Sequence, residues 1–482
     1  MTARLPPGGP MSDLAFLSAV ELLEGYRQRA FSPVEVIRAC LSRIERSGAA
    51  LNAFVHVDAD GALASAHASE QRWQRGAPAG ALDGVPVTIK DLILTRGVPT
   101  RRGSKAVDPA GPWESDAPVT ARLREAHAVI LGKTSTPEMG WKAVTDSPLI
   151  GVARNPWNPA MTPGGSSGGA AIAAATGMGA LHVGTDGGGS IRIPASFCGI
   201  FGLKPSFGRV PAWPLSPTGT VAHLGPMTRT VADAALMLNT ITRPDSRDWH
   251  SLPYDARDYL AGLDDGIAGA RIAWSPGLGR FDVERDVAEV VATAVRAFDE
   301  IGALVEEVDP SLPDVHAIFT PHWWVGCYNA VRALPPEKRA LLDPGLASVA
   351  QEGSRIALPD YLNAIAARAA LGAMLREFHT RYDFLVTPTV AVSPFTAGRL
   401  APEALGNIGS DWTRWASFSF PFNLTQQPAA TVPCGFTASG LPVGLQIIGA
   451  MHDDRGVLRA ARAFERARPW HGSYAHWANH SA

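Results

Sequence analysis

The stretch that decides the fold reads Ala180-Leu-His-Val-Gly-Thr-Asp-Gly-Gly-Gly-Ser-Ile-Arg-Ile-Pro-Ala195. Its first five residues form a short, mostly apolar run of the kind that is typical of a buried strand. Three consecutive glycines follow and lead directly to Ser190. A glycine-rich turn after a strand presents several backbone N–H groups together. The pattern predicts a strand that ends in a turn, with a serine hydroxyl beside a row of N–H donors.

Other apolar runs extend this strand into a sheet. Further strands are expected at residues 85–89, 128–132, 384–388, 430–433 and 443–448. Helical patterns are expected at residues 117–128, 169–175, 231–238 and 455–468, and capping boxes at Ser18 and Ser32 predict two helices near the start of the chain. This alternation predicts an α/β fold, with a sheet that helices cover on both faces.

The domain organisation follows from changes in composition along the chain. Residues 240–380 are richer in Asp and Pro and contain long helical patterns such as 359–378, which predicts a variable, peripheral helical insertion that carries part of a substrate pocket. Residues 1–11 are short, Pro/Gly-rich and without an apolar segment, so we expect a disordered leader rather than a secretion signal. Residues 12–482 are expected to form a single domain.

Composition excludes several classes of function. Of the 482 residues, 46% are hydrophobic and 18% are charged, and the net charge of −2 comes from interspersed residues of both signs. This favours a folded enzyme that binds neither nucleic acid nor membranes. The four cysteines show no zinc-like spacing, which predicts buried thiols in a reducing, cytoplasmic setting and no metal.

A second glycine-serine cluster, Pro163-Gly-Gly-Ser-Ser-Gly-Gly169, precedes the turn of residues 187–190 in the sequence. Neither cluster has the spacing of a phosphate-binding loop, and both adjoin apolar patterns rather than the polar flanks of a linker. The N–H groups of residues 187–190 (Gly187, Gly188, Gly189 and Ser190) could instead form an oxyanion hole around a nucleophilic Ser190.

A serine nucleophile needs a base. None of the 13 histidines lies in a cluster that resembles the glycine motifs, although distance along the sequence does not exclude a histidine that the fold brings close. Arg192 stands where a G-x-S-x-G motif would have its last glycine. Lys90 ends the strand expected at 85–89, and burial would lower its pKa enough for it to accept a proton. Taken alone, Lys90 is more simply interpreted as a strand-end lysine that reaches solvent.

The motifs together resemble the amidase signature family. The resemblance runs from about residue 12 to residue 470 and rests on segments 84–91, 163–169, 184–195, 197–205, 208–211, 225–229, 231–234, 428–433 and 440–449. It implies a large, mixed, twisted sheet with helices on both faces and a Ser–cis-Ser–Lys triad. In that triad Ser190 attacks the carbonyl, Ser166 follows a cis peptide bond and relays a proton, and Lys90 is the base.

The same resemblance implies supporting roles. Ser167 would assist Lys90, and Asp186 and Arg192 would pair to brace the loop. The chain departs from the family at two positions: Gly187 stands where relatives often have a bulkier residue, and Gln426 stands where many have glycine.

The substrate is less defined by the sequence. The family includes the glutaminase subunit of tRNA-dependent amidotransferases, which needs charged side chains to hold free glutamine, whereas residues 415–422 are apolar here. This favours a stand-alone amidase for hydrophobic acyl or aryl amides. Carbamate or ester hydrolysis, a homodimer and the role of a glutaminase subunit stay open, and no cofactor is expected. The candidate pocket residues are Met139, Trp141, Trp323, Trp324 and Trp415.

Overall fold

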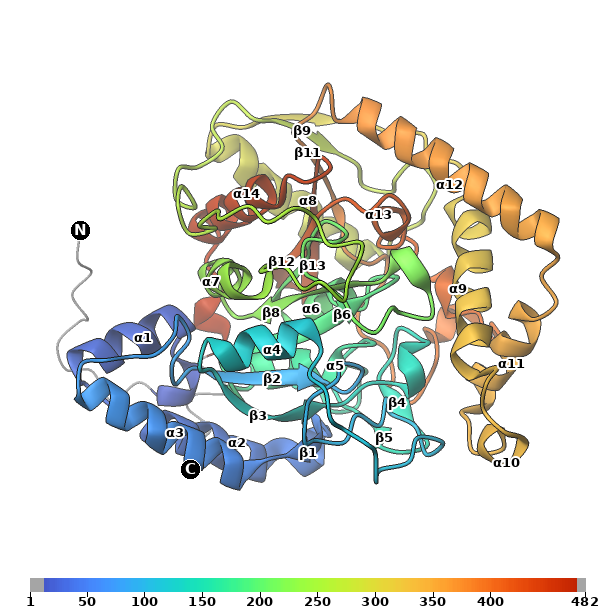
Figure 1. Ribbon diagram of the computed structural model, residues 1–482. Helices are drawn as coiled ribbons and strands as arrows, with labels where there is room; N and C mark the ends of the chain where they lie inside the picture. Colours follow the sequence, from blue (N-terminus) through green and yellow to red (C-terminus); the bar gives the residue numbers. More distant parts are fainter. Residues whose placement is uncertain (1–12, 475–482) are drawn as a thin grey trace.

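The computed structural model describes residues 13–474, apart from the side chains of residues 48 and 49, so the leader expected at residues 1–11 lies outside it. An eleven-stranded sheet in the order β1-β3-β2-β6-β8-β7-β12-β13-β11-β9-β10 runs through the molecule (Figure 1). Its strands are β1 (Phe54–Val57), β2 (Pro86–Lys90), β3 (Val129–Thr134), β6 (Leu181–Asp186), β7 (Phe201–Lys204), β8 (His223–Thr228), β9 (Arg271–Trp274), β10 (Leu304–Glu307), β11 (Phe384–Pro388), β12 (Ala429–Phe436) and β13 (Pro442–Gly449). A separate pair consists of β4 (Asp146–Ser147) and β5 (Gly151–Val152).

Helices surround this sheet. They are α1 (Ala19–Gln28), α2 (Pro33–Leu51), α3 (Ala59–Gln74), α4 (Pro118–Glu125), α5 (Gly168–Ala175), α6 (Arg192–Cys198), α7 (Val231–Ile241), α8 (Arg285–Glu300), α9 (Val315–Val331), α10 (Pro336–Arg339), α11 (Pro344–Gly353), α12 (Leu358–Phe378), α13 (Pro421–Leu424) and α14 (Asp454–Ala467). The α/β class and the mixed sheet expected from the sequence are therefore confirmed, and every strand and helix predicted above is present within a few residues.

The sheet is buried on both faces. On β11, Leu385 packs in a cluster with α9, α11 and α12, whereas its neighbours Phe384 and Val386 pack in the cluster that contains α8 and α14. Successive side chains of a strand point to opposite faces, so the two clusters lie on opposite sides of the sheet at β11. Continuous apolar strands such as 85–89 follow from this arrangement.

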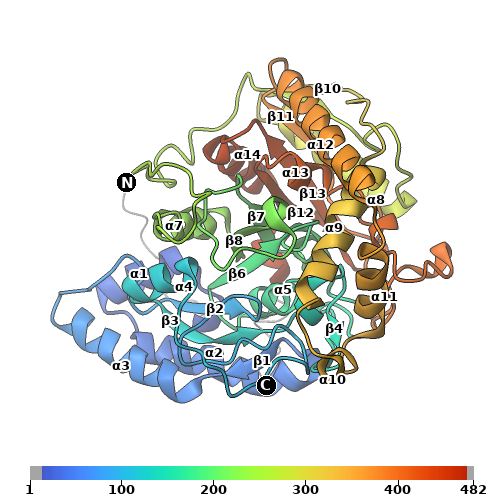
Figure 2. The same cartoon turned by 45° about the vertical axis from the view of Figure 1, so that its right-hand side comes forward.

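The helical insertion expected at residues 240–380 is narrower than predicted. Residues 271–307 contribute β9, α8 and β10, a parallel unit that extends the main sheet at its edge. Only α9 to α12 form a peripheral helical group, which stands at one side of the molecule in both views (Figures 1 and 2). β9 and β10 were not predicted from the sequence. Each strand has four residues and β10 is largely exposed, so neither shows a long apolar run.

Strand pairing brings Lys90 close to the glycine turn that follows β6. β2 lies between β3 and β6 and is parallel to both, so Lys90 at the end of β2 and Asp186 at the end of β6 reach the same edge of the sheet. Crevices outside the carboxyl ends of parallel strands are the usual ligand sites of such sheets.

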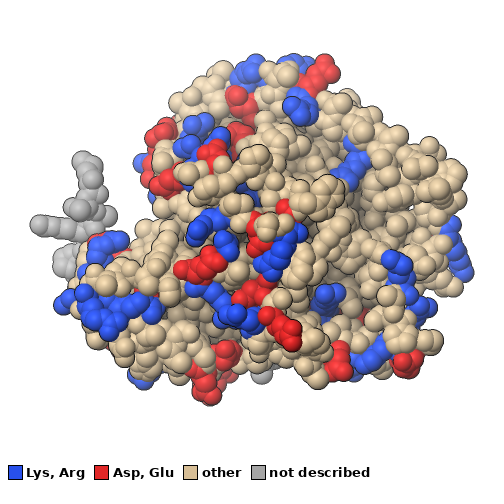
Figure 3. All heavy atoms as spheres, in the orientation of Figure 1, with Lys and Arg blue, Asp and Glu red and all other residues tan. Residues whose placement is uncertain are grey.

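The molecular surface shows no single-sign charge pattern on the face drawn in Figure 3, where basic and acidic side chains are interspersed. Within residues 13–474, none of the helices has the length and apolarity that a membrane crossing requires.

Helix α5 consists of small, buried residues, so replacing its Gly169 by alanine should destabilise the protein. A Cβ on Gly169 would lie 2.3 Å from the backbone nitrogen of Ser135 and 2.4 Å from the carbonyl oxygen of Ala53, whereas a Cβ on Gly372 of α12 would meet nothing within 4 Å. Gly169→Ala should therefore lower the free energy of unfolding by about 1–3 kcal/mol or more. Gly372→Ala should raise it by about 0.5–1 kcal/mol. Denaturant unfolding followed by circular dichroism checks both, and equal midpoints for the two variants would contradict the packing described.

Candidate active site

Lys90 is fully buried and its side-chain nitrogen contacts three hydroxyl groups. Nζ lies 2.7 Å from Ser166 Oγ, 2.9 Å from Ser167 Oγ and 2.8 Å from Thr185 Oγ1. The solvent-reaching lysine that the strand pattern alone suggested is therefore excluded. The structure brings Lys90, Ser166 and Ser167 together, and it adds Thr185, which the sequence did not single out.

The hydrogen-bond directions in this cluster are constrained. Ser167 Oγ donates its one proton to the carbonyl of Thr185 at 3.1 Å, so Lys90 must donate to Ser167 rather than accept from it. Burial lowers the pKa of Lys90 well below its ordinary value, and the negative charge of Asp186 only partly opposes this shift. A neutral lysine amine has a lone pair, which can accept the proton of Ser166 Oγ.

Ser166 and Ser167 are held by the start of helix α5. The peptide bond between Gly165 and Ser166 is cis, as the family resemblance implied. Ser167 is the N-cap residue of α5, and its backbone N–H donates to the carbonyl of Ser190 at 3.1 Å. This backbone contact ties the two glycine-serine clusters to each other.

The glycine turn after β6 uses one of its N–H groups internally. Gly189 N–H donates to Asp186 Oδ1 at 2.8 Å. Within residues 13–474, the N–H groups of Gly187, Gly188 and Ser190 have no acceptor in the protein. The geometry therefore reduces the expected set of four oxyanion donors to three, because Gly189 is engaged by the carboxylate.

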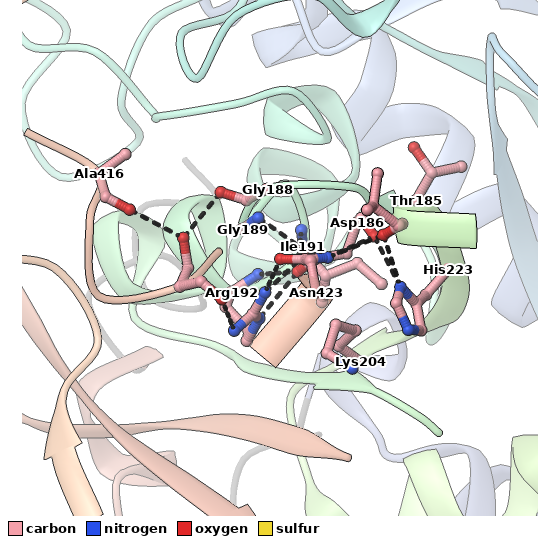
Figure 4. A network of polar contacts seen from close by, with 12 residues as sticks. Thr185, Asp186, Gly188, Gly189, Ile191, Arg192, Lys204, His223, Ala416 and Asn423 are labelled. Atoms are coloured by element: carbon pink, nitrogen blue, oxygen red, sulfur yellow. Dashed lines mark hydrogen bonds and ion pairs between the residues drawn. The ribbon is translucent and has the colours of Figure 1, made fainter. Parts of the chain in front are cut away.

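Asp186 and Arg192 form a fully buried pair behind this turn (Figure 4). Arg192 Nη2 lies 2.9 Å from Asp186 Oδ1, and Nε donates to Oδ2 at 3.0 Å. The remaining guanidinium hydrogens go to Asn423, to Gln446 and to the carbonyl of Ser419. Burial alone would raise the pKa of Asp186, but the charge and hydrogen bonds of Arg192, with a hydrogen bond from Asn423, hold that pKa well below its ordinary value.

A cavity of about 260 Å³ opens above the hydroxyl groups. Ser166, Thr185, Gly187 and Ser190 line its floor. One wall comes from α9 and its surroundings, with Trp141, Trp323, Gly326, Cys327, Ala330 and Leu346. Further lining comes from residues 92–94, Ala117 and the loop of residues 206–219. Most of this lining is apolar, which suits a bulky apolar group.

The five candidate pocket residues divide into two groups. Met139, Trp141 and Trp323 line the cavity. Trp324 and Trp415 do not, so these two predictions were wrong. Trp324 is the next residue of α9 and therefore points to a different side of that helix, where it lines a surface groove with His316 and Arg355. Trp415 is buried in the core, where it stacks on Phe197 and donates to the carbonyl of Leu400.

The apolar segment of residues 415–422 also lies outside the cavity. Ser419 Oγ donates to the carbonyl of Gly188 at 2.7 Å, which places the segment behind the glycine turn. The apolar character of this segment therefore reflects core packing. In the sequence alone it was an argument against a glutaminase subunit, and the structure removes that argument.

The two departures from the family have structural explanations. A Cβ on Gly187 would lie 2.7 Å from the ring of Trp323, so the indole occupies the volume that a bulkier residue would need. Gln426 has a φ of 67°, the left-handed region that favours glycine, and its amide donates to the carbonyl of Thr220.

The loop of residues 206–219 is the largest element that the sequence reasoning missed. Its Phe207, Trp213 and Leu215 all line the cavity. Only residues 208–211 stand out in the sequence, as a family motif, because an irregular loop has no periodicity that reveals which side chains point inward.

No metal site accompanies these groups in the described part of the chain, where no cluster of three or more His, Cys, Asp or Glu side chains is arranged to hold an ion. Cys40, Cys198 and Cys327 are buried free thiols, and Cys434 is partly exposed.

Comparison with known protein families and sequences agrees with this geometry. A family model described as Amidase matches residues 35–458. The chain is 37% identical to an acylamidase of Rhodococcus erythropolis, over 95% of this chain and 97% of that protein. It is also 37% identical to a glutamyl-tRNA(Gln) amidotransferase subunit of Myxococcus xanthus (strain DK1622), over 94% and 97% of the two chains.

Solved structures give the same result. The crystal structure of a bacterial aryl acylamidase of the amidase signature family matches with a TM-score of 0.89 and 31% identity, covering 97% of this chain and 99% of that one. A 6-aminohexanoate cyclic dimer hydrolase in complex with its substrate matches with a TM-score of 0.87 and 25% identity, covering 95% and 98%. The family match over most of the length, with these relatives, shows that the chain belongs to the amidase signature family.

Proposed function

We propose that the protein hydrolyses the C–N bond of amides with a bulky apolar acyl or aryl group, through an acyl-enzyme on Ser190. The observation that carries the proposal is the buried Lys90, which contacts the hydroxyl of Ser166 beside a cavity that Ser190 also lines. Membership of the amidase family makes the chain an amide-hydrolysing enzyme, and the acylamidase relatives support amides as the substrate class.

The proposed reaction has two halves. Ser190 Oγ attacks the carbonyl carbon while its proton passes to Ser166 Oγ, and the proton of Ser166 passes to the lone pair of Lys90 Nζ. The N–H groups of Gly187, Gly188 and Ser190 hold the negative oxygen that forms. Lys90 then returns a proton through Ser166 to the leaving nitrogen, and the C–N bond breaks. A water molecule attacks the resulting ester by the same proton path and releases the acid.

A second candidate is the glutaminase subunit of an amidotransferase. The similarity to the amidotransferase protein of Myxococcus xanthus favours it, because it is as high as the similarity to the acylamidase. The two candidates differ in what the isolated chain does. The first requires turnover of apolar aryl amides without a partner, whereas the second requires free glutamine as the preferred substrate. A panel of aryl amides, carbamates, esters and glutamine, compared by kcat/KM, decides between them.

Substitution of the proposed nucleophile and base gives the most direct test. Ser190→Ala should lower kcat for an aryl amide by about 10⁴-fold or more, and Lys90→Met should do so to a similar extent, because the groups act as one unit. Absorbance of the released arylamine measures both rates. A fluorophosphonate probe should label Ser190 in the unmodified enzyme, and labelling of a different serine would overturn the assignment.

The pH dependence of kcat/KM should follow Lys90. Because the base must be neutral, activity should rise with pH as Lys90 loses its proton and should level off well below pH 10, since burial lowers its pKa. His223 also lines the cavity, and burial lowers its pKa well below the ordinary value. His223→Gln should leave the midpoint of the limb in place. Lys90→Arg should remove the activity, because a guanidinium does not deprotonate. A midpoint that moves in His223→Gln would contradict this role of Lys90.

The close contact between Gly187 and Trp323 predicts a coupled pair. Gly187→Ala should lower kcat/KM about tenfold, because the new Cβ would lie 2.7 Å from the indole and either the turn or the ring must shift. Adding Trp323→Ala should recover part of that loss, although Trp323→Ala alone changes the cavity wall. A double-mutant cycle measures the coupling, and additive effects would show that the two positions do not compete for one volume.

A further inference from the structure

One arginine in the cavity lacks a partner. Arg102 is half-buried and lines the same cavity as Ser166 and Ser190. Among the residues that the structure describes, none accepts a hydrogen bond from its guanidinium and no carboxylate lies within ion-pair distance. A guanidinium carries five N–H donors and stays charged, so leaving all of them unpaired in a partly buried position is unusual.

The nearby carboxylates are already engaged elsewhere. Asp91 accepts the backbone N–H groups of Arg101 and Gly103, each at 3.1 Å, and lies 3.6 Å from the ammonium of Lys133. Glu138 accepts from Ser104 and from the backbone N–H of Asp343. Both carboxylates therefore have other partners, and neither forms an ion pair with Arg102.

Asp248, the acidic residue of the cavity wall, is likewise satisfied. Its two carboxylate oxygens accept the N–H groups of Ala212 and His250 at 2.8 and 2.9 Å. In the part of the chain that the structure covers, the positive charge of Arg102 is therefore the one charge in the cavity wall whose hydrogen-bonding groups stay free.

The backbone fixes Arg102 close to the reacting groups. Its φ of 55° lies in the left-handed region, and the residue is held on both sides: its N–H donates to Asp91 O at 3.0 Å, and its carbonyl accepts from Met139 N at 2.8 Å. The residue after Met139, Gly140, lies so near the relay serine that a Cβ there would be 3.4 Å from Ser166 Oγ. Arg102 is thus anchored to the turn that borders the catalytic hydroxyls.

We infer that Arg102 is a specificity-determining residue that binds a carboxylate of the substrate, so that the preferred amides carry an anionic group in addition to their apolar part. Arginine pairs with carboxylates through two parallel N–H···O bonds, which a half-buried site strengthens. The inference rests on the proposed amide hydrolysis and deepens it. Free glutamine is a member of the same class, because it is an amide that carries a carboxylate.

The test compares matched amides that differ only in charge. On the leaving-group side, 4-acetamidobenzoate is compared with 4-methylacetanilide, and on the acyl side glutaric acid monoanilide is compared with hexananilide. The unmodified enzyme should prefer the carboxylate member of at least one pair by about tenfold or more in kcat/KM, as expected for a charge-assisted hydrogen bond. The pair that shows the preference identifies which side of the scissile bond faces Arg102. Free glutamine is assayed in the same experiment.

Variants assign the preference to Arg102. Arg102→Met should abolish it, Arg102→Lys should keep part of it, and Arg101→Met should keep it, because Arg101 is the neighbouring half-buried arginine and does not line the cavity. Thermal unfolding of each variant shows that it folds. The inference is overturned if neither pair shows a preference, or if Arg102→Met leaves the preference unchanged.

A binding experiment separates this inference from the proposed function. Calorimetry on Ser190→Ala protein measures the Kd of 4-acetamidobenzoate and glutaric acid monoanilide without turnover, and adding Arg102→Met should weaken the tighter of the two at least about tenfold. An unchanged Kd overturns the role of Arg102 even if amides are hydrolysed. Conversely, a weakened Kd together with no hydrolysis of any amide would support the carboxylate site and reject the proposed reaction.

Discussion

The buried pair between Asp186 and Arg192 joins three parts of the chain that are far apart in sequence. Asp186 ends β6, Arg192 begins α6, and the guanidinium reaches Asn423 on α13 and Gln446 on β13. The same carboxylate also accepts the N–H groups of Gly189 and Ile191 and thereby shapes the glycine turn. Removing one partner of a buried pair costs about 3–5 kcal/mol, so the shape of this turn and the stability of the fold depend on the same contact.

A second consequence of Asp186 concerns its negative charge. The charge favours the protonated form of Lys90, whereas burial favours the neutral form, and burial prevails. The pairing with Arg192 limits how strongly Asp186 acts on the lysine, because the two opposite charges partly cancel at a distance. The sheet positions the proposed base in this way, since parallel pairing of β2 and β6 helps to place an otherwise ordinary lysine among three hydroxyls without contact with solvent.

The sequence predicted those elements whose residues show a regular apolar pattern or a distinctive turn. Long apolar runs indicated β2, β6 and β11, and the glycine turn drew attention to Ser190, but Ser166 and the role of Lys90 came from the family resemblance. Thr185 could have been found, because it lies one position before Asp186 on the strand that pairs with β2. Trp324 and Trp415 were misplaced because a large aromatic side chain fills a core as readily as a pocket, and composition does not distinguish the two. Arg102 and residues 206–219 required the three-dimensional structure, since their importance lies in what they face.

Helix α5 has a further consequence for which substitutions the chain tolerates. Residues 170–175 are alanines and one isoleucine, all with no exposed surface, so the helix lies close against its neighbours and offers no volume to spare. Most substitutions at these positions would introduce larger side chains, which the packing around the helix does not accommodate without a shift. The cavity walls, in contrast, come from α9 and from a loop outside the sheet. Substitutions in these walls can therefore change which molecules are accepted without touching the packing that holds Ser166 and Ser167 in place.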